Sequence, residues 1–161
     1  MDAFRGTGER LRPVASSEGR STGVFQTRVE WVDTDASGMY HNSTVTRFVE
    51  AAEATLFRSR GLDGYFPSAP RVRYEADFLA PLRFGQEVTA VVSLARVGTS
   101  SMTWEFEVWG ESFESSPRSL AARGRYVTVH IGPAALPSDG ARSARPWPVE
   151  WLTALTAECV P

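Results

Sequence analysis

Hydrophobic side chains recur at three- and four-residue spacing between Ser43 and about Arg60, which is the pattern of one face of an amphipathic helix. The stripe consists of Val45, Phe48, Val49, Ala52, Leu56 and Phe57. Asn42 or Ser43 supplies a helix N-cap, and Gly61 supplies a C-terminal stop. Alanines at positions 51, 52 and 54 make part of this helix thin, so we expect it to lie close against a sheet.

Alternation of apolar and polar residues predicts strands in the rest of the chain. The segments are 24–32, 71–79, 87–97, 102–110 and 120–131, and a short amphipathic helix follows at 149–155. One strand, one long helix and then a run of strands indicate an α+β domain in which an antiparallel sheet wraps the helix. The outer face of this sheet would expose residues such as Trp109, so we expect a homodimer at least.

The ends of the chain differ from this central region. Residues 1–22 are rich in Gly, Ser and Arg without an apolar period, which predicts a flexible N-terminal arm. Residues 23–132 are predicted to form the single domain. Residues 133–161 are predicted to form a Pro-rich linker and the short C-terminal helix.

The composition limits the classes of function. At 161 residues and 42% hydrophobic, the chain suits one domain with a substantial core. A formal net charge of −2 gives no general attraction to nucleic acid or to anionic lipid, so we expect neither as a partner. The first residues lack the apolar core of a signal peptide and no run of about 18 apolar residues occurs, which predicts a cytoplasmic protein with no membrane association.

Residue types exclude several chemistries. Cys159 is the single cysteine, which rules out a disulfide framework or a cysteine-ligated zinc site within one chain. All 17 basic residues are arginine, so a lysine Schiff base and a Walker A loop are impossible. The segment that starts at Asp33 superficially matches a calcium loop, but its twelfth position is Thr44 where a glutamate is needed. We expect no metal and no cofactor.

The segment 32–42 carries the strongest functional signal. A strand-like run ends in two acids, turns through Gly38 and leads into the long helix. This order places a carboxylate opposite helix N–H groups that have no intrahelical partner, which is what acyl transfer requires. We predict that Asp35 is the active carboxylate, in a partly buried cleft that raises its pKa, and that Asp33 caps or orients the loop. The N–H groups near Asn42 are predicted to stabilise an oxyanion.

Other interpretations stay open for these residues and their neighbours. Asp35 could instead satisfy only the N–H groups of its turn. His41 either assists proton transfer or is a polar loop histidine without a catalytic part. Glu50, at the edge of the apolar stripe, either reaches a cleft or lies in solvent, whereas Glu53 fits a solvated helix surface better. His130 ends a strand and is interpreted as structural, and no Gly-x-Ser-x-Gly motif supports a Ser-His-Asp triad.

Several motifs follow one another along the chain. They are Asp-Thr-Asp-Ala-x-Gly at 33–38 with the polar pair at 41–42, Phe-x-Glu-Ala-Ala at 48–52, the segments 78–85 and 100–106, and an arginine-bearing last strand at 121–125. In this order they resemble the hotdog-fold thioesterases of the 4-hydroxybenzoyl-CoA thioesterase and acyl-CoA thioesterase type. The resemblance covers roughly residues 24 to 132.

The resemblance implies a long central helix wrapped by a five-stranded antiparallel sheet, assembled as a homodimer or homotetramer with active sites at the subunit interface. It also implies that Asp35 is the catalytic carboxylate, acting as nucleophile or as base on water, and that the amide near Asn42 polarises the thioester carbonyl. Two features depart from the family. Some bacterial relatives have histidine at the position of Asn42, and many have a tyrosine shortly after it, whereas this chain continues Ser-Thr-Val at 43–45.

We therefore expect a cofactor-independent thioesterase that hydrolyses an acyl group carried by coenzyme A or by an acyl carrier protein, in fatty-acid or polyketide metabolism. Two alternatives are a hotdog dehydratase or hydratase on 3-hydroxyacyl thioesters, and a non-catalytic acyl-thioester binding protein. Arg123 and Arg125 either meet pantetheine-linked phosphates or are solvated at the strand edge. The sequence leaves the acyl group and its carrier open.

Overall fold

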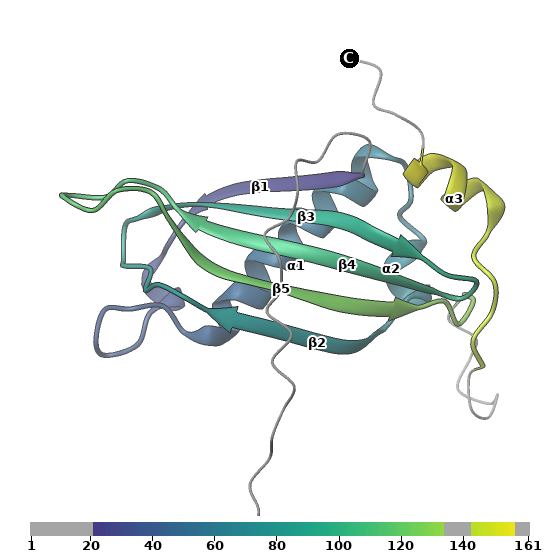
Figure 1. The fold of residues 1–161 in the computed structure, drawn as a ribbon, viewed down its shortest axis with the longest axis horizontal. Coiled ribbons are helices and arrows are strands. Elements are labelled where there is room, and N and C mark those ends of the chain that lie inside the picture. Colours follow the sequence, from purple (N-terminus) through teal and green to yellow (C-terminus); the bar gives the residue numbers. More distant parts are fainter. Residues whose placement is uncertain (1–20, 134–142, 157–161) are drawn as a thin grey trace, which may run out of the picture.

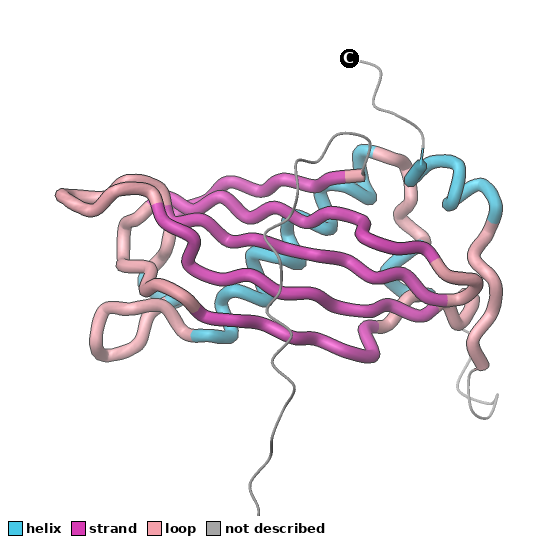
Figure 2. Tube along the Cα trace, viewed as in Figure 1, coloured by secondary structure: helices cyan, strands magenta, loops and turns pink. Residues whose placement is uncertain are grey.

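A computed structural model describes residues 21–133 and 143–156. Five antiparallel strands form one sheet in the order β1-β3-β4-β5-β2 (Figures 1 and 2). The strands are β1 (Thr22–Arg28), β2 (Arg71–Phe78), β3 (Glu87–Val97), β4 (Ser101–Gly110) and β5 (Ser119–Val129). The helices are α1 (Asn42–Ser59), α2 (Tyr65–Ser68) and α3 (Val149–Thr156), with a 3-10 turn at Trp31–Asp33. The predicted five-stranded antiparallel sheet and long helix are confirmed.

Helix α1 lies across one face of the sheet (Figure 1). Its apolar stripe is buried as the spacing predicts, and Phe48, Val49 and Ala52 have no exposed surface. The closest approach is at Gly23 of β1, where an added Cβ would lie 2.3 Å from the carbonyl oxygen of Ala52. Only glycine fits there, so the alanine-rich part of α1 does pack tightly against the sheet, as expected.

The first strand is shorter than the sequence pattern predicts. β1 ends at Arg28, and Trp31–Asp33 form the 3-10 turn instead of the end of a strand. The Asp33 carboxylate accepts the N–H of Glu30 at 2.9 Å, and the N–H of Asp33 donates to the Glu30 carbonyl at 3.0 Å. These local bonds compete with strand pairing, and they leave Trp31 72% exposed.

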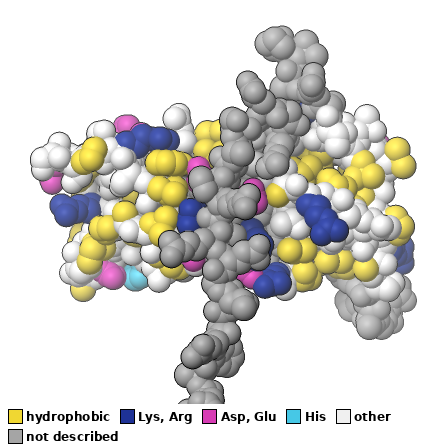
Figure 3. All heavy atoms as spheres, viewed as in Figure 1, with side chains coloured by type: hydrophobic (Ala, Val, Ile, Leu, Met, Phe, Trp, Pro, Cys, Tyr) yellow, Lys and Arg dark blue, Asp and Glu magenta, His cyan; other side chains and the backbone are white. Residues whose placement is uncertain are grey.

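The outer face of the sheet is mixed, because charged pairs lie between its hydrophobic side chains. Arg125 on β5 donates to Glu75 on β2 at 2.8 Å across this face. Trp109 is only half-buried, but its indole N–H donates to Glu107 and the guanidinium of Arg118 lies 4.2 Å from its ring centre. Basic and acidic side chains are accordingly interspersed with hydrophobic ones on this side of the molecule (Figure 3).

The segment before α3 closes one end of the core. Trp147 is 4% exposed and stacks between Tyr65 and His130, with ring centres 5.8 and 5.2 Å away. Nδ1 of His130 lies 2.7 Å from the carbonyl oxygen of Pro146, in hydrogen-bond distance. The structural interpretation of His130 is confirmed. The predicted arm at 1–22 lies outside the described residues except for its last two, and much of the predicted linker lies outside them as well.

Candidate active site

Asp33 fixes the loop between β1 and α1. Its side chain is buried, and besides the Glu30 N–H it holds an ion pair with Arg47 of α1. Its carbonyl oxygen accepts the N–H of His41 at 2.8 Å. Asp33 therefore joins the loop to the start of the helix, and its predicted role in orienting the loop stays a prediction.

Asp35 stands in a tight turn within this loop. Its N–H donates to the carbonyl of Met39 at 2.9 Å, and its own carbonyl accepts the N–H of Gly38 at 3.0 Å. Gly38 has φ +74°, a conformation in which a side chain would be strained. The carboxylate Oδ1 accepts both the N–H of Ser37, at 2.7 Å, and the Ser37 hydroxyl. The turn thus holds the Asp35 carboxylate in one orientation.

The environment of Asp35 differs from the prediction. The side chain is exposed in the single chain, so burial contributes little to its pKa. The hydrogen bonds from the side chain and backbone of Ser37 instead lower the pKa below its ordinary value, and the nearby charge of His41 adds to this. The expected desolvated carboxylate with a raised pKa is therefore wrong for one chain, and Asp35 is ionised at neutral pH.

Helix α1 begins at Asn42, so neither predicted N-cap, Asn42 or Ser43, is correct. His41 is the N-cap and makes no side-chain capping bond. The N–H of Thr44 donates to the His41 carbonyl at 2.9 Å. Within the described residues, the N–H groups of Asn42 and Ser43 have no hydrogen-bond acceptor. Two donors at the positive end of the helix are therefore free to receive an anionic oxygen.

Asp35 and Asn42 line the same cavity. It has a volume of about 350 Å³ and lies between the loop and the C-terminal end of β2. Its other lining residues are Met39, Tyr40, Phe78, Leu79, Ala80 and Pro81. The cavity therefore combines an ionised carboxylate, the start of a helix and an apolar wall. His41, the neighbour of Asn42, is exposed beside it.

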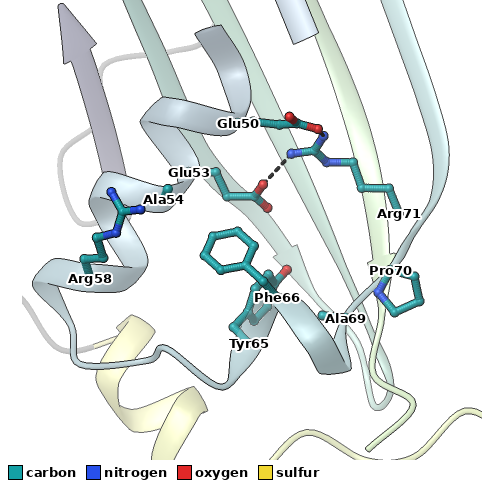
Figure 4. A pocket seen from close by; sticks show the side chains of 9 residues that line it. All are labelled: Glu50, Glu53, Ala54, Arg58, Tyr65, Phe66, Ala69, Pro70 and Arg71. Carbon is teal, nitrogen blue, oxygen red and sulfur yellow. Dashed lines mark hydrogen bonds and ion pairs between the residues drawn. The ribbon is translucent and has the colours of Figure 1, made fainter. Parts of the chain in front are cut away.

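Glu50 lies in a different cavity. It is exposed and forms an ion pair with Arg71 at 2.7 Å, at a part of α1 that faces the start of β2 (Figure 4). The structure thus does not bring Glu50 to Asp35 within one chain. Tyr40 and the Phe78–Pro81 corner were missed as lining residues, although the sequence pattern already marked 78–85 as a family motif.

The position of Glu53 also differs from the prediction. It is 2% exposed instead of solvated, and its carboxylate pairs with Arg71. Burial raises the pKa of Glu53 and outweighs the opposing effect of the Arg71 charge. Its spacing of four from Val49 and from Phe57 places it on the buried stripe, and that spacing was the available signal.

Neither strand arginine lies at the Asp35 cavity. Arg123 and Arg125 pair with Asp77 and Glu75 on the outer face of the sheet. Over residues 21–133 and 143–156, no three His, Cys, Asp or Glu side chains gather closely enough to hold a metal ion. No helix within these stretches is long and apolar enough to cross a membrane.

A family model matches part of this region. Residues 37–114, a little under half of the chain, match the model of the thioesterase superfamily. The matched range contains His41, Asn42 and Glu50 and begins just after Asp35, so the assignment of Asp35 rests on its geometry in the loop.

Solved thioesterases share the fold of this domain. A 1,4-dihydroxy-2-naphthoyl-CoA thioesterase from Synechocystis matches with a TM-score of 0.68 and 24% identity, over 83% of this chain and 95% of that one. The 4-hydroxybenzoyl-CoA thioesterase of Pseudomonas sp. strain CBS-3 matches with a TM-score of 0.71 and 19% identity, over 83% and 99%. A variant of a 4-hydroxybenzoyl-CoA thioesterase with aspartate replaced by asparagine, complexed with 4-hydroxybenzoyl-CoA, matches with a TM-score of 0.71 and 17% identity, over 84% and 99%.

These likenesses confirm the hotdog fold expected from the sequence motifs. No curated protein matches the chain in sequence. The fold of the domain is therefore established, and its chemistry has to be argued from the Asp35 cavity.

Proposed function

We propose that this domain is a thioesterase, which hydrolyses an acyl thioester of coenzyme A or of an acyl carrier protein to a free carboxylic acid and a thiol. One observation carries the proposal: an ionised carboxylate, Asp35, lines the same cavity as the start of α1, where the Asn42 and Ser43 N–H groups have no described acceptor. Two of the solved relatives are named for acyl-CoA substrates, and a third holds one.

In this proposal the thioester carbonyl oxygen docks at the start of α1. The N–H of Asn42 or Ser43 donates to it, and the helix dipole stabilises the negative charge as the carbonyl carbon becomes tetrahedral. Asp35 either attacks that carbon directly or accepts a proton from the attacking water. The carbon–sulfur bond then breaks, and the thiolate that leaves takes a proton. Where Asp35 is the nucleophile, water then hydrolyses the mixed anhydride on Asp35, which releases the carboxylic acid and restores the carboxylate. A pKa below the ordinary value keeps Asp35 ionised, which both roles require.

His41 is the candidate helper. It is exposed at the N-cap, and its charge acts on Asp35. From that place it can supply the proton for the departing thiolate. The apolar residues Met39, Phe78 and Leu79 give the acyl group or the pantetheine arm a surface beside the reacting carbon.

The test is thiol release from a panel of acyl-CoA and acyl carrier protein substrates. We expect Asp35→Asn to lower kcat/KM by at least about a hundredfold, the low end for loss of a positioned proton-transfer group, with the fold unchanged. Asp63→Asn, which alters an exposed carboxylate before α2, is the matched control. Near-normal hydrolysis by Asp35→Asn would overturn the mechanism.

The same panel separates the alternatives. An enoyl absorbance change without free thiol would indicate a dehydratase or hydratase. Binding of acyl-CoA without any thiol release at high protein concentration would indicate a non-catalytic binder. Nothing in the described residues favours either over hydrolysis.

We further propose that the protein works as a homodimer or homotetramer. Six exposed large hydrophobic side chains lie in the loops and strand end around the Asp35 cavity, namely Trp31, Val32, Met39, Phe78, Leu79 and Phe84. An apolar group of this kind on a monomer commonly marks an interaction surface. Light scattering on the purified protein measures the state directly.

A further inference from the structure

The two oxygens of the Asp35 carboxylate have different surroundings. Oδ1 accepts the N–H of Ser37 at 2.7 Å and also the Ser37 hydroxyl. Within the described residues Oδ2 has no comparable hydrogen bond and no ion pair, and the N–H of Met39 and the charge of His41 act on the carboxylate more weakly than Ser37 does. A carboxylate oxygen has two lone pairs, so Oδ1 is occupied and Oδ2 is the oxygen that is free to react.

The donors that hold Oδ1 stand on a closed turn. The N–H of Asp35 donates to the Met39 carbonyl at 2.9 Å, and the N–H of Gly38 donates to the Asp35 carbonyl at 3.0 Å. Ser37 lies between these two bonds, and Gly38 with φ +74° completes the turn. The Ser37 N–H is therefore fixed toward Oδ1, and the hydroxyl adds a second donor beside it.

The Ser37 side chain does nothing else that the structure describes. It is exposed, and within the described residues its hydroxyl bonds only to Oδ1. The motif at 33–38 specifies Asp35 and Gly38 but leaves position 37 open, so the hydroxyl is an addition to that motif. Because its removal leaves no hole in the core, a change in rate on removal can be attributed to the Asp35 carboxylate.

We infer that Ser37 is a positioning residue for Asp35: it holds Oδ1, so that Oδ2 is the oxygen that attacks the thioester carbon or accepts the proton of the attacking water. This inference rests on the hydrolytic role proposed for Asp35. The two bonds restrict rotation of the carboxylate, which lines the same cavity as Asn42. A restricted carboxylate loses less entropy on the way to the transition state.

The Ser37 hydroxyl has two opposite effects on the rate. As a donor to Oδ1 it lowers the pKa of Asp35, and a carboxylate of lower pKa is a weaker base and a weaker nucleophile. As a restraint it keeps Oδ2 in place, which raises the rate. Removal of the hydroxyl therefore raises kcat if only the pKa matters, and lowers kcat if the position of Oδ2 matters more. The sign of the change separates the two effects.

The test is steady-state thiol release at neutral pH from an acyl thioester that the wild-type protein hydrolyses. We expect Ser37→Ala to lower kcat by about tenfold with little change in KM, because a hydrogen bond to a charged group contributes about 1.5 kcal/mol and 1.4 kcal/mol is tenfold. Ser37→Thr keeps the hydroxyl and should retain most of kcat. Thr34→Ala is the matched control, because that hydroxyl belongs to the same loop but bonds to the Trp31 carbonyl, at 2.9 Å, and its loss should leave kcat unchanged.

A double variant shows whether Ser37 acts through Asp35. In an Asp35→Asn background, Ser37→Ala should cause no further fall in thiol release, since the carboxylate that Ser37 positions is absent. An unchanged or raised kcat in Ser37→Ala, an equal loss in Ser37→Thr or in Thr34→Ala, or a further fall in the double variant would each overturn the inference. Normal thiol release by Asp35→Asn alone would instead overturn the proposed function. Circular dichroism of every variant checks that the fold is unchanged.

Discussion

Replacement of Gly23 by alanine tests the closest contact between the sheet and α1. The new Cβ would lie 2.3 Å from the carbonyl oxygen of Ala52 and 2.8 Å from the Cβ of Leu56. Ordinary contact requires β1 and α1 to separate by about 1 Å, and β1 cannot move alone because Gly23 pairs with Val92 of β3. Overpacking of a core costs about 1–3 kcal/mol, and a backbone oxygen cannot rotate away, so we expect a loss near 3 kcal/mol.

For a chain of this length, about 3 kcal/mol corresponds to a fall in Tm of roughly 6–12 °C. Chemical and thermal denaturation followed by circular dichroism measure both quantities. Gly64→Ala is the matched control, because its Cβ would meet Trp151 at an ordinary 3.6 Å with φ −73°, and we expect a change below about 1 kcal/mol. If Gly23→Ala were as stable as that control, the packing of β1 on α1 would be looser than the structure indicates.

Two substitutions in the loop test how Asp35 is held. Ser37→Ala removes the largest cause of the lowered Asp35 pKa, so the acid limb of the kcat/KM profile should move to higher pH; an unmoved limb would contradict Asp35 as the titrating group. Asp33→Asn removes the ion pair with the half-exposed Arg47, and we expect a loss of about 1 kcal/mol in denaturation. The same variant should lower thiol release by about tenfold or more, because the loop would no longer fix Asp35; unchanged kcat/KM would contradict the orienting role.

Much of the fold could be predicted because the two hydrophobic periods are clear in this chain. The three- and four-residue spacing of hydrophobic residues predicts α1. The alternation of apolar and polar residues predicts β4, where Met102, Trp104 and Phe106 are buried. The end of β1 could not be predicted, because Trp31 and Val32 favour strands by type. Bonds between Asp33 and Glu30, which depend on the three-dimensional turn, override that preference.

The outer face of the sheet shows a second limit of pattern analysis. Alternation identifies which residues share a face, but not how their side chains interact across strands. Arg125 and Glu75 are far apart in the sequence and become partners only through the β2–β5 register. The same register decides that this face carries charged pairs, which the position of Trp109 alone could not reveal.

The candidate carboxylates show the limit of sequence-pattern analysis most clearly. The sequence predicts a partly buried Asp35 and a solvated Glu53, yet Asp35 is exposed at its cavity and Glu53 is buried. Exposure of Asp35 depends on the local turn, in which its side chain bonds to Ser37 and its carbonyl accepts the N–H of Gly38. Burial of Glu53 depends on Arg71, a residue 18 positions away that supplies the compensating charge.

A raised pKa often marks a functional acid, and on that criterion alone Glu53 would be preferred to Asp35. The shift of Glu53 has a structural cause, since burial and its pair with Arg71 account for it. Hydrolysis of a thioester also needs donors for the oxyanion, and the free N–H groups of α1 lie at the cavity of Asp35. A docked acyl thioester would itself displace water from Asp35, which raises the pKa of a carboxylate where it acts. The geometry of donors is therefore our reason to propose Asp35 as the catalytic carboxylate.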